Sequence, residues 1–331
     1  MLKFVFTCGD INGIGPEIAV KSLNKITIKH PSTKFYFLCP SDILDNTFSF
    51  VNPSFDYNII KSTKTNSSCQ VSIIDLGKVK RNTGIPTKIS GETAFKALYQ
   101  SYKTIESGAT NAVITAPVSK TALRMAGIKF PGQTEMFAKW TRSSNYVMTF
   151  LSYKINAALY TIHIPLKNVS NLLSLKRLRE TLNVIIHTLQ VDLGLSDFKI
   201  AVLGLNPHAG ENGMIGNEEK RVIQPVIKQF AKSIDIQGPF SPDAFFGNKM
   251  YKKFDMVLGM YHDQVLIPFK MMNFGKGVNY TAGLPIVRTS PDHGVAYDIA
   301  EKFIADESSM IQAYKYARKI VKNRKKKFVT D

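Results

Sequence analysis

Short apolar runs alternate with longer helical patterns along the whole chain, and this alternation constrains the fold more than any other feature. An alternation of strands and helices implies right-handed crossovers and a largely parallel sheet with helices on both faces. We therefore predict an α/β fold. The apolar runs expected as strands are 3–8, 35–39, 112–115, 157–162, 198–203 and 256–260.

The helical patterns lie between these runs, at 16–23, 90–107, 175–189 and 218–233. Pro16 fits the first turn of its helix, Ser90 is expected as the N-cap of the next, and Pro225 is expected to kink or divide the last. With 331 residues the chain has room for about two such α/β domains.

The net charge of +18, from 43 basic and 25 acidic residues, first suggests a polyanionic partner. Eight of the basic residues lie between 315 and 327, where there is no acidic residue. The remainder of the chain still carries 35 basic against 25 acidic residues, a net +10. Charge spread in this way is more typical of a lysine-rich surface than of a nucleic-acid-binding stripe. We therefore expect no nucleic-acid partner.

Three widely separated cysteines, with no CxxC pair, exclude a disulfide framework and a zinc ribbon. No apolar run approaches the roughly 18 residues of a membrane span, and the N-terminal run is too short for a signal peptide. A soluble, cytoplasmic protein is expected. Neither GxGxxG after the first strand nor GxxxxGK[ST] occurs, so the common dinucleotide fingerprint and the P-loop are both missing.

The loops after the predicted strands are rich in Gly, Pro, His and Asp, including a long block at 260–300 that we expect to be one loop-like segment. Loops at the carboxyl ends of parallel strands carry the ligand sites of α/β sheets. His163, His208 and His262 each follow an apolar strand directly. Three imidazoles at one sheet edge would suit a catalytic divalent metal with an open position, such as zinc. Each histidine alone could equally be a solvated loop residue.

The block 260–300 also contains Lys270, Asn279 and Arg288. Arginine can hold an oxyanion through two hydrogen bonds, and lysine supplies a point charge. Such a set fits a phosphorylated or carboxylated small substrate. For any single lysine of this chain, an ordinary surface position is the alternative.

Taken in order, the loop motifs resemble those of the 4-hydroxythreonine-4-phosphate dehydrogenase family. The resemblance runs from Gly9 to about Ala300. It rests on GDINGIGPE, TAPVSK, PGQTE, HIPL, LNPHAGENGMIGNEE, GPFSPDAFF, MYHDQ and FGKGVNYTAGLPIVRTSPDHG.

The resemblance implies two α/β domains with a cleft between them, like those of isocitrate and isopropylmalate dehydrogenases, which bind NAD without GxGxxG. It implies a first domain at 1–127 plus 296–331 and a second at 128–295 that carries the metal and dimer contacts. It further implies a homodimer with shared active sites, NAD or NADP as cofactor, and one divalent metal (zinc, magnesium or cobalt) per site.

The expected reaction is the oxidation and decarboxylation of 4-phosphooxy-L-threonine to 3-amino-2-oxopropyl phosphate, in pyridoxal 5′-phosphate biosynthesis. The family's functional positions fall on residues of this chain. They are His163, His208 and His262 for the metal, Asp243 and Lys270 for catalysis, Gln133, Thr134, Lys270, Asn279 and Arg288 for the substrate, and Asp292, His293 and Gly294 for the cofactor.

One position departs from the family motif. The family has His before Thr in this turn, whereas this chain has Gln133 before Thr134. Glutamine donates and accepts hydrogen bonds but carries neither a proton nor a charge at neutral pH. A related dehydrogenase of a 4-phosphorylated four-carbon hydroxy acid without the amine is therefore the alternative. A metal hydrolase that uses the three histidines is a further one.

Overall fold

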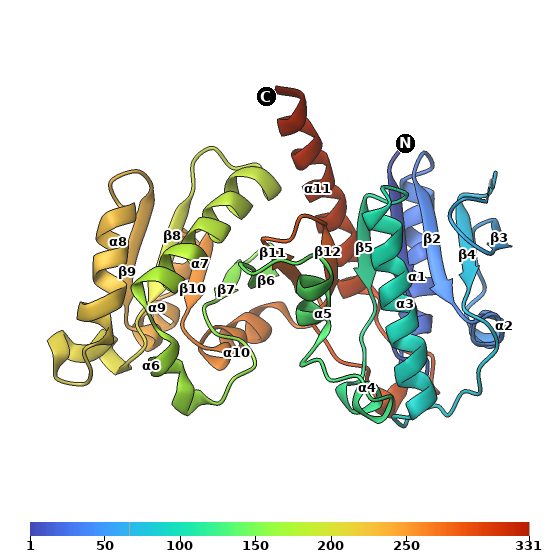
Figure 1. The fold of residues 1–331 in the computed structure, drawn as a ribbon, viewed down its shortest axis with the longest axis horizontal. Helices are drawn as coiled ribbons and strands as arrows, with labels where there is room; N and C mark the ends of the chain where they lie inside the picture. Colours follow the sequence, from blue (N-terminus) through green and yellow to red (C-terminus); the bar gives the residue numbers. More distant parts are fainter. Residues whose placement is uncertain (66, 331) are drawn as a thin grey trace. The chain divides into compact units, whose positions relative to one another are not determined.

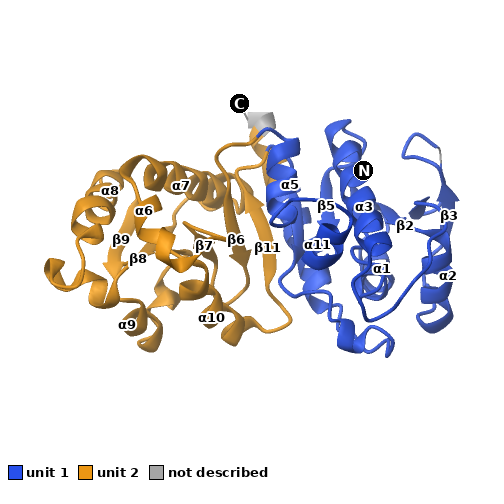
Figure 2. Ribbon diagram, turned by 60° about the horizontal axis from the view of Figure 1, so that its bottom comes forward, with its two compact units in different colours: residues 1–142, 285–321 blue, residues 143–284, 322–331 orange. Residues whose placement is uncertain are grey.

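The computed structural model describes residues 1–65 and 67–330, which form two compact α/β units (Figures 1 and 2). Unit 1 comprises Met1–Arg142 and Pro285–Val321; unit 2 comprises Ser143–Leu284 and the chain from Lys322 onward. The domain boundaries expected from the sequence, at 127/128 and 295/296, stay a prediction, and residue 331 lies outside the described residues.

The strands of unit 1 pair in the order β3-β4-β2-β1-β5-β12, and every neighbouring pair is parallel. Residues of β1, β2 and β5 are almost all buried, as expected for strands covered on both faces. The strands are β1 (Lys3–Thr7), β2 (Lys34–Cys39), β3 (Tyr57–Ile60), β4 (Val71–Asp75), β5 (Ala112–Thr115) and β12 (Arg288–Pro291).

Long helices cross between these strands. Thr87 is the N-cap of the second long helix, α3, and shares a reciprocal capping box with Ser90, so the sequence-based assignment of Ser90 as the cap was wrong by three residues. The helices of unit 1 are α1 (Gly15–Lys29), α2 (Ser41–Phe50), α3 (Lys88–Glu106), α4 (Lys120–Met125), α5 (Gln133–Trp140), the 3₁₀ turn η6 (Tyr297–Ile299) and α11 (Ser308–Thr330), which passes into unit 2 at Lys322.

The strands of unit 2 pair in the order β11-β6-β7-β10-β8-β9. The β11–β6 and β6–β7 pairs are antiparallel, and the remaining pairs are parallel. Apolar side chains from β6, β7, β8 and β10 pack into one core with Phe245 and Phe269. The strands are β6 (Val147–Leu151), β7 (Ala157–Leu159), β8 (Lys199–Leu203), β9 (Asp235–Phe240), β10 (Met256–Gly259) and β11 (Val278–Ala282).

The helical patterns expected at 175–189 and 218–233 are present in unit 2, and Pro225 lies at the start of α8, where it separates α8 from the preceding π turn. The segments are η1 (Leu166–Asn168), α6 (Val169–Leu172), α7 (Leu175–His187), η2 (Thr188–Asp192), η3 (Pro207–Gly213), η4 (Glu219–Ile223), α8 (Gln224–Phe230), α9 (Pro242–Gly247), η5 (Met250–Lys253) and α10 (His262–Asn273).

The expectation of one loop-like block at 260–300 was wrong, because most of this block is α10, β11 and β12. Helix α10 contains Pro268 in its interior, which obscures a helical pattern in the sequence. The two strands are only 5 and 4 residues long and lie among glycines and polar residues. Neither strand therefore shows the kind of apolar run from which the strands at 3–8, 35–39, 112–115, 157–162, 198–203 and 256–260 were predicted.

Among the residues that the structure describes, no helix is long and apolar enough to cross a membrane.

Candidate active site

Arg288 is the centre of a polar cluster in unit 1. It opens β12 and is 2% exposed. Its Nε and Nη2 donate to the hydroxyl of Thr115, at 3.1 and 2.9 Å, and Nη2 also donates to Oε1 of Gln133 at 2.8 Å. Burial lowers the pKa of the Arg288 guanidinium to about 9, against the opposing effect of the Glu135 carboxylate. A buried guanidinium held in one orientation is suited to bind an oxyanion.

Gln133 is fixed at both ends of its amide. Its Nε2 donates to the Ala116 carbonyl at 3.0 Å, while its Oε1 accepts from Arg288. Because the carbonyl can only accept, it sets which end of the amide faces the arginine. Gln133 begins α5, and the neighbouring Thr134 is 2% exposed. The structure thus brings Gln133 and Arg288 together, although 155 residues separate them in the chain.

The glycine-rich turn at 9–17 is organised around Asp10, which is buried. One Asp10 oxygen accepts from the Tyr297 hydroxyl at 2.8 Å and from Ser90 Oγ at 3.2 Å, and the other accepts from the Asn12 backbone at 2.9 Å. Burial raises the pKa of the Asp10 carboxyl above its ordinary value, although these three donors oppose the shift. Burial of Asp10 therefore favours the neutral carboxyl, whereas its three hydrogen bonds favour the carboxylate.

The residue directly after the predicted cofactor segment lies against this turn. The Val295 carbonyl, one residue after Gly294, accepts from the Ile14 backbone at 3.0 Å. A Cβ added to Gly13 would lie 2.5 Å from the same carbonyl, so only glycine permits this approach. The Asp292 carboxylate accepts from Ser309 Oγ at 3.2 Å. Within unit 1, the chain just after the predicted cofactor segment is thus packed against the turn.

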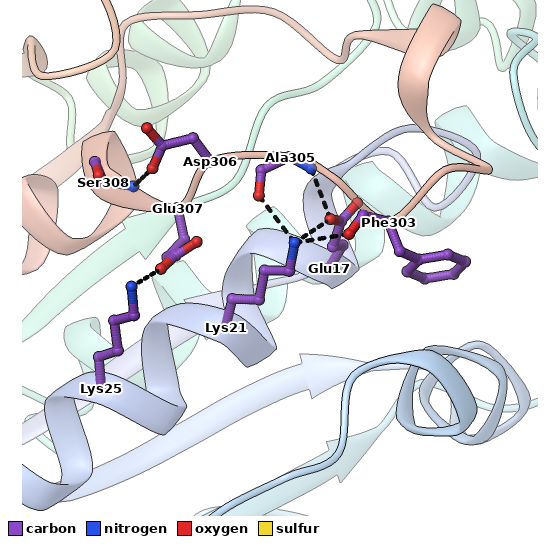
Figure 3. Close-up of polar contacts among 8 residues, drawn as sticks. All are labelled: Glu17, Lys21, Lys25, Phe303, Ala305, Asp306, Glu307 and Ser308. Carbon is purple, nitrogen blue, oxygen red and sulfur yellow. Dashed lines mark hydrogen bonds and ion pairs between the residues drawn. The ribbon is translucent and has the colours of Figure 1, made fainter.

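Glu17, the last residue of the glycine-rich motif, anchors the first helix rather than extending the cluster (Figure 3). Its Oε1 accepts from Lys21 Nζ at 2.6 Å and from the Ala305 backbone at 2.8 Å, and Lys21 also donates to the Phe303 and Ala305 carbonyls. Lys25, one turn further along α1, pairs with Glu307. Glu17 is therefore assigned a structural role in holding α1 to the 303–307 segment.

Two of the three predicted metal ligands lie together in unit 2. The ring centroids of His163 and His262 are 6.1 Å apart, and both residues line a pocket of ≈360 Å³ with Tyr261 and Leu166. His262 Nδ1 lies 2.6 Å from Oδ1 of Asp263. Histidine ligands commonly donate their second ring nitrogen to a carboxylate in this way, which leaves Nε2 free for a metal.

His208 is carried by η3, and it contributes to holding the pKa of Asp243 below its usual value, after the larger effect of a 2.5 Å hydrogen bond from Ser241 Oγ. Within the described residues, no group of three or more His, Cys, Asp and Glu side chains is already arranged to hold a metal ion. The donor chemistry of His163, His208 and His262 fits a borderline divalent ion such as zinc or cobalt.

The remaining predicted residues of unit 2 lie on regular elements. Lys270 is exposed on the last turn of α10. Asn279 lies on β11 opposite Phe150, and its Oδ1 is buried with no hydrogen-bond partner in the structure. A buried amide oxygen without a hydrogen-bond partner lowers the stability of a fold. A hydrogen-bond donor on a bound substrate would satisfy this oxygen.

Sequence reasoning missed three residues that complete these clusters. Thr115, which receives the Arg288 hydrogen bonds, ends the apolar run at 112–115 and could have been found from that position alone. Asp263 directly follows His262, so the HD pair was a readable signal. Tyr297 lies 287 residues from Asp10, and no local pattern indicates their contact.

The family model described as "Pyridoxal phosphate biosynthetic protein PdxA" matches residues 32–317 of this chain. The chain belongs to the PdxA family. It is 39% identical over 320 residues to the 4-hydroxythreonine-4-phosphate dehydrogenase of Desulforapulum autotrophicum, with 94% of this chain and 93% of the relative covered. A PdxA relative from Oceanobacillus iheyensis, named as a D-threonate 4-phosphate dehydrogenase, is 37% identical over 318 residues, which cover 93% of this chain and 94% of the relative.

Solved PdxA structures agree with this assignment. The crystal structure of 4-hydroxythreonine-4-phosphate dehydrogenase from Klebsiella pneumoniae superposes with a TM-score of 0.81 at 34% identity, covering 97% of this chain and 100% of that one. Isocitrate dehydrogenase from Methylococcus capsulatus matches at 13% identity with a TM-score of 0.51, over 98% of this chain and 87% of that one. The predicted family and the isocitrate dehydrogenase-like α/β fold are thus confirmed. This PdxA chain is an oxidoreductase, which argues against the hydrolase alternative.

Proposed function

We propose that the chain oxidises and decarboxylates 4-phosphooxy-L-threonine, giving 3-amino-2-oxopropyl phosphate for pyridoxal 5′-phosphate biosynthesis, with NAD and a divalent metal. The observation that carries this proposal is the similarity of nearly the whole chain to enzymes named 4-hydroxythreonine-4-phosphate dehydrogenase. The buried Arg288, held by Thr115 and Gln133, supports an anionic substrate.

In this proposal, the chain's own residues bind and orient the substrate. Arg288, Lys270 and Asn279 hold its phosphate and carboxylate, which fixes the secondary hydroxyl and the departing carboxylate in place. Gln133, which accepts a hydrogen bond from Arg288, and the neighbouring Thr134 are further proposed substrate contacts. Binding of this kind orients the substrate for reaction. Because hydrogen bonds already hold Arg288 in place, little reorganisation of this side chain is needed during the reaction.

Asp243 is the proposed proton-handling residue. Oxidation removes a hydride from the hydroxyl-bearing carbon and the hydroxyl proton, and decarboxylation later requires a proton at the neighbouring carbon. The Asp243 carboxylate, which accepts a hydrogen bond from the Ser241 hydroxyl at 2.5 Å, is proposed to accept the first proton.

The cofactor and the metal supply the remaining chemistry. NAD⁺ would accept the hydride, and Asp292, His293 and Gly294 would bind the adenosine part of this cofactor. A divalent metal held by His163, His208 and His262 would polarise the reacting oxygen. NAD is proposed over NADP, and the KM values for the two cofactors measured with the same substrate decide between them.

We further propose a homodimer with shared active sites. Ile267 and Met271 on α10, and Phe274 directly after it, are spaced four and three residues apart, as on one face of a helix. Their side chains are 58%, 81% and 92% exposed. An apolar stripe of this kind is typical of an interface. Sedimentation of the wild type should give a dimer, and Phe274→Glu should shift it toward monomer; a monomeric wild type would exclude shared sites.

The substrate is tested by NADH absorbance with 4-phosphooxy-L-threonine and with 4-phosphorylated hydroxy acids that lack the amine. The amino acid phosphate should be the better substrate by kcat/KM when zinc, cobalt or magnesium is supplied. The second candidate, a dehydrogenase of the deaminated acid, is favoured by Gln133 and by the similarity to the D-threonate 4-phosphate enzyme. A higher kcat/KM for the deaminated acid, reversed by Gln133→His, would replace the first proposal with the second. No NADH from either would exclude both.

A further inference from the structure

The segment that carries His208 has an unusual backbone. Within η3, His208, Ala209, Gly210, Glu211 and Asn212 have φ angles of 50°, 51°, 81°, 42° and 55°. This is a run of left-handed residues, a conformation that residues with a Cβ rarely adopt even singly. A left-handed turn of this length persists only where its surroundings hold it in place.

Glu219 lies against this turn and is 1% exposed. Its Oε1 accepts hydrogen bonds from the backbone amides of Leu205 and Asn206, both at 2.8 Å, and its Oε2 accepts from the Asn206 side chain at 3.0 Å. These bonds fix the point at which the chain leaves β8 and enters the turn. Bonds from amides to a buried carboxylate are among the stronger hydrogen bonds in proteins.

The turn is also shaped to receive this carboxylate. A Cβ added to Gly210 would lie 2.6 Å from Glu219 Oε2, so a side chain at this position would collide with the carboxylate. The flanking residues extend the contact: Glu218 accepts from Asn206 Nδ2 at 2.8 Å, and Lys220 donates to the Asn212 carbonyl. Three consecutive side chains thus hold the turn, and Glu219 is the buried one.

Glu219 itself begins a π turn, η4, directly before α8. One-turn π segments often occur at functional sites, where they displace a side chain from the regular helical position. The NEE sequence at 217–219 belongs to the motif that includes His208, yet the proposed chemistry gives neither glutamate a role.

We infer that Glu219 is a positioning residue for His208: by holding the left-handed turn, it sets where the imidazole lies relative to His163 and His262. This inference rests on the proposed role of His208 as a metal ligand.

The test compares Glu219→Gln and Glu219→Ala with the wild type after removal of bound metal by chelation. In Glu219→Gln, the amide nitrogen of the glutamine would face the amide nitrogen of Asn206, and two donors cannot form a hydrogen bond with each other. Glu219→Gln therefore loses part of the contact, and Glu219→Ala loses all of it. Two quantities are measured: hydrogen exchange at the Leu205 and Asn206 amides without metal, and Co²⁺ affinity by calorimetry with the visible spectrum of the bound ion. Val226→Ala, which truncates a fully buried side chain of α8, controls for a general loss of stability.

We expect faster exchange at both amides and Co²⁺ affinity weakened by roughly 10–100-fold, more in Glu219→Ala than in Glu219→Gln, as for other residues that orient metal ligands. Val226→Ala should bind Co²⁺ like the wild type. Wild-type Co²⁺ affinity in Glu219→Gln would overturn the inference, as would an equal loss in Val226→Ala. If the wild type binds no Co²⁺, the proposed metal site is wrong, and the exchange rates alone then decide whether Glu219 holds the turn.

Discussion

Replacing Gln133 by alanine is the most direct test of the Arg288 cluster. The wild-type amide joins the Ala116 carbonyl, 3.0 Å from Nε2, to the guanidinium, 2.8 Å from Oε1. Gln133→Ala removes both hydrogen bonds and leaves Arg288 with the Thr115 hydroxyl and its other neighbours. We expect the buried cation to remain but to lose its fixed orientation.

The size of the effect follows from the hydrogen bond that is lost. A hydrogen bond to a charged group contributes about 1.5–3 kcal/mol. At ~1.4 kcal/mol for each factor of ten, this corresponds to roughly 10–150-fold in kcat/KM if the whole bond serves substrate binding. Because the Thr115 bonds remain, the lower half of this range is expected, mainly as an increase in KM for the phosphorylated substrate.

The assay combines NADH formation with the fluorescence of the single tryptophan, Trp140. Trp140 ends the helix that Gln133 begins, and its ring lies 5.2 Å from that of Phe137, which packs near Arg288. Titration with substrate should therefore report binding without turnover. Lys139→Ala, an exposed change on the same helix, should leave both KM and the titration unchanged.

An unchanged KM in Gln133→Ala would refute this reasoning, because it would mean that the orientation of Arg288 does not depend on the amide. A loss of kcat with no change in KM would also refute it, since that pattern indicates a role in the chemical step instead of in binding.

Three further outcomes follow from the structure. Arg324→Met should lower the free energy of unfolding in urea by about 3–5 kcal/mol, because it leaves the fully buried Asp192 carboxylate without its guanidinium, whereas the exposed Lys325→Met should have little effect. Since the folded-state pKa of Asp10 lies above its ordinary 3.8, its contribution to stability is present below 3.8 and is lost as the pH rises through the folded value; the stability of the wild type relative to Asp10→Asn should fall over that interval and then level off. Tyr297→Phe should raise the KM for NAD by roughly 3–10-fold while the substrate KM stays constant, because it removes the hydrogen bond that joins the chain just after the predicted cofactor segment to Asp10.

The parts of the fold that could be predicted from the sequence are those in which local pattern and burial agree. The strands at 35–39 and 112–115 are apolar at nearly every position because both faces are covered, so their runs stand out. The pairing of His163 with His262 was also predictable. Both residues follow strands that are parallel neighbours, β7 and β10, whose carboxyl ends meet at one edge.

The polar clusters could not be predicted in the same way, because their partners come from distant segments. Arg288 reaches Thr115 over 173 residues and Gln133 over 155. The resemblance to a family pointed to Arg288 and Gln133 as separate substrate contacts, but not to the hydrogen bond that couples them. This coupling exists only in the folded unit, where a change at Gln133 also removes a hydrogen bond from Arg288.

The role of the charges in the basic C-terminal run could not be predicted from the sequence either. Eight basic residues in 13 positions suggested a polyanion site, yet Arg324, in the middle of the run, donates at 2.7 Å to a carboxylate that is fully buried, and also to the Tyr280 hydroxyl at 3.0 Å. Burial, together with the Asp192 carboxylate, raises the pKa of Tyr280 against the opposing effect of Arg324. Tyr280 and Asp192 raise the pKa of Arg324 against the opposing effect of its burial. At least one charge of the run therefore stabilises unit 2, and net charge overstates what is available to a partner.

The left-handed turn at His208 also depends on a side chain from another segment. Of its five left-handed residues, only Gly210 adopts that conformation without steric cost, and Asn212 is the other residue that tolerates it well. Local preference would therefore not have produced the turn; it depends on a carboxylate at Glu219, which lies 11 residues after His208 and on a different helical segment. A histidine recognised from its place after a strand can thus depend, for its position, on a glutamate that is not itself a proposed metal ligand. Substitutions at such a glutamate should weaken metal binding while leaving every ligand in the chain.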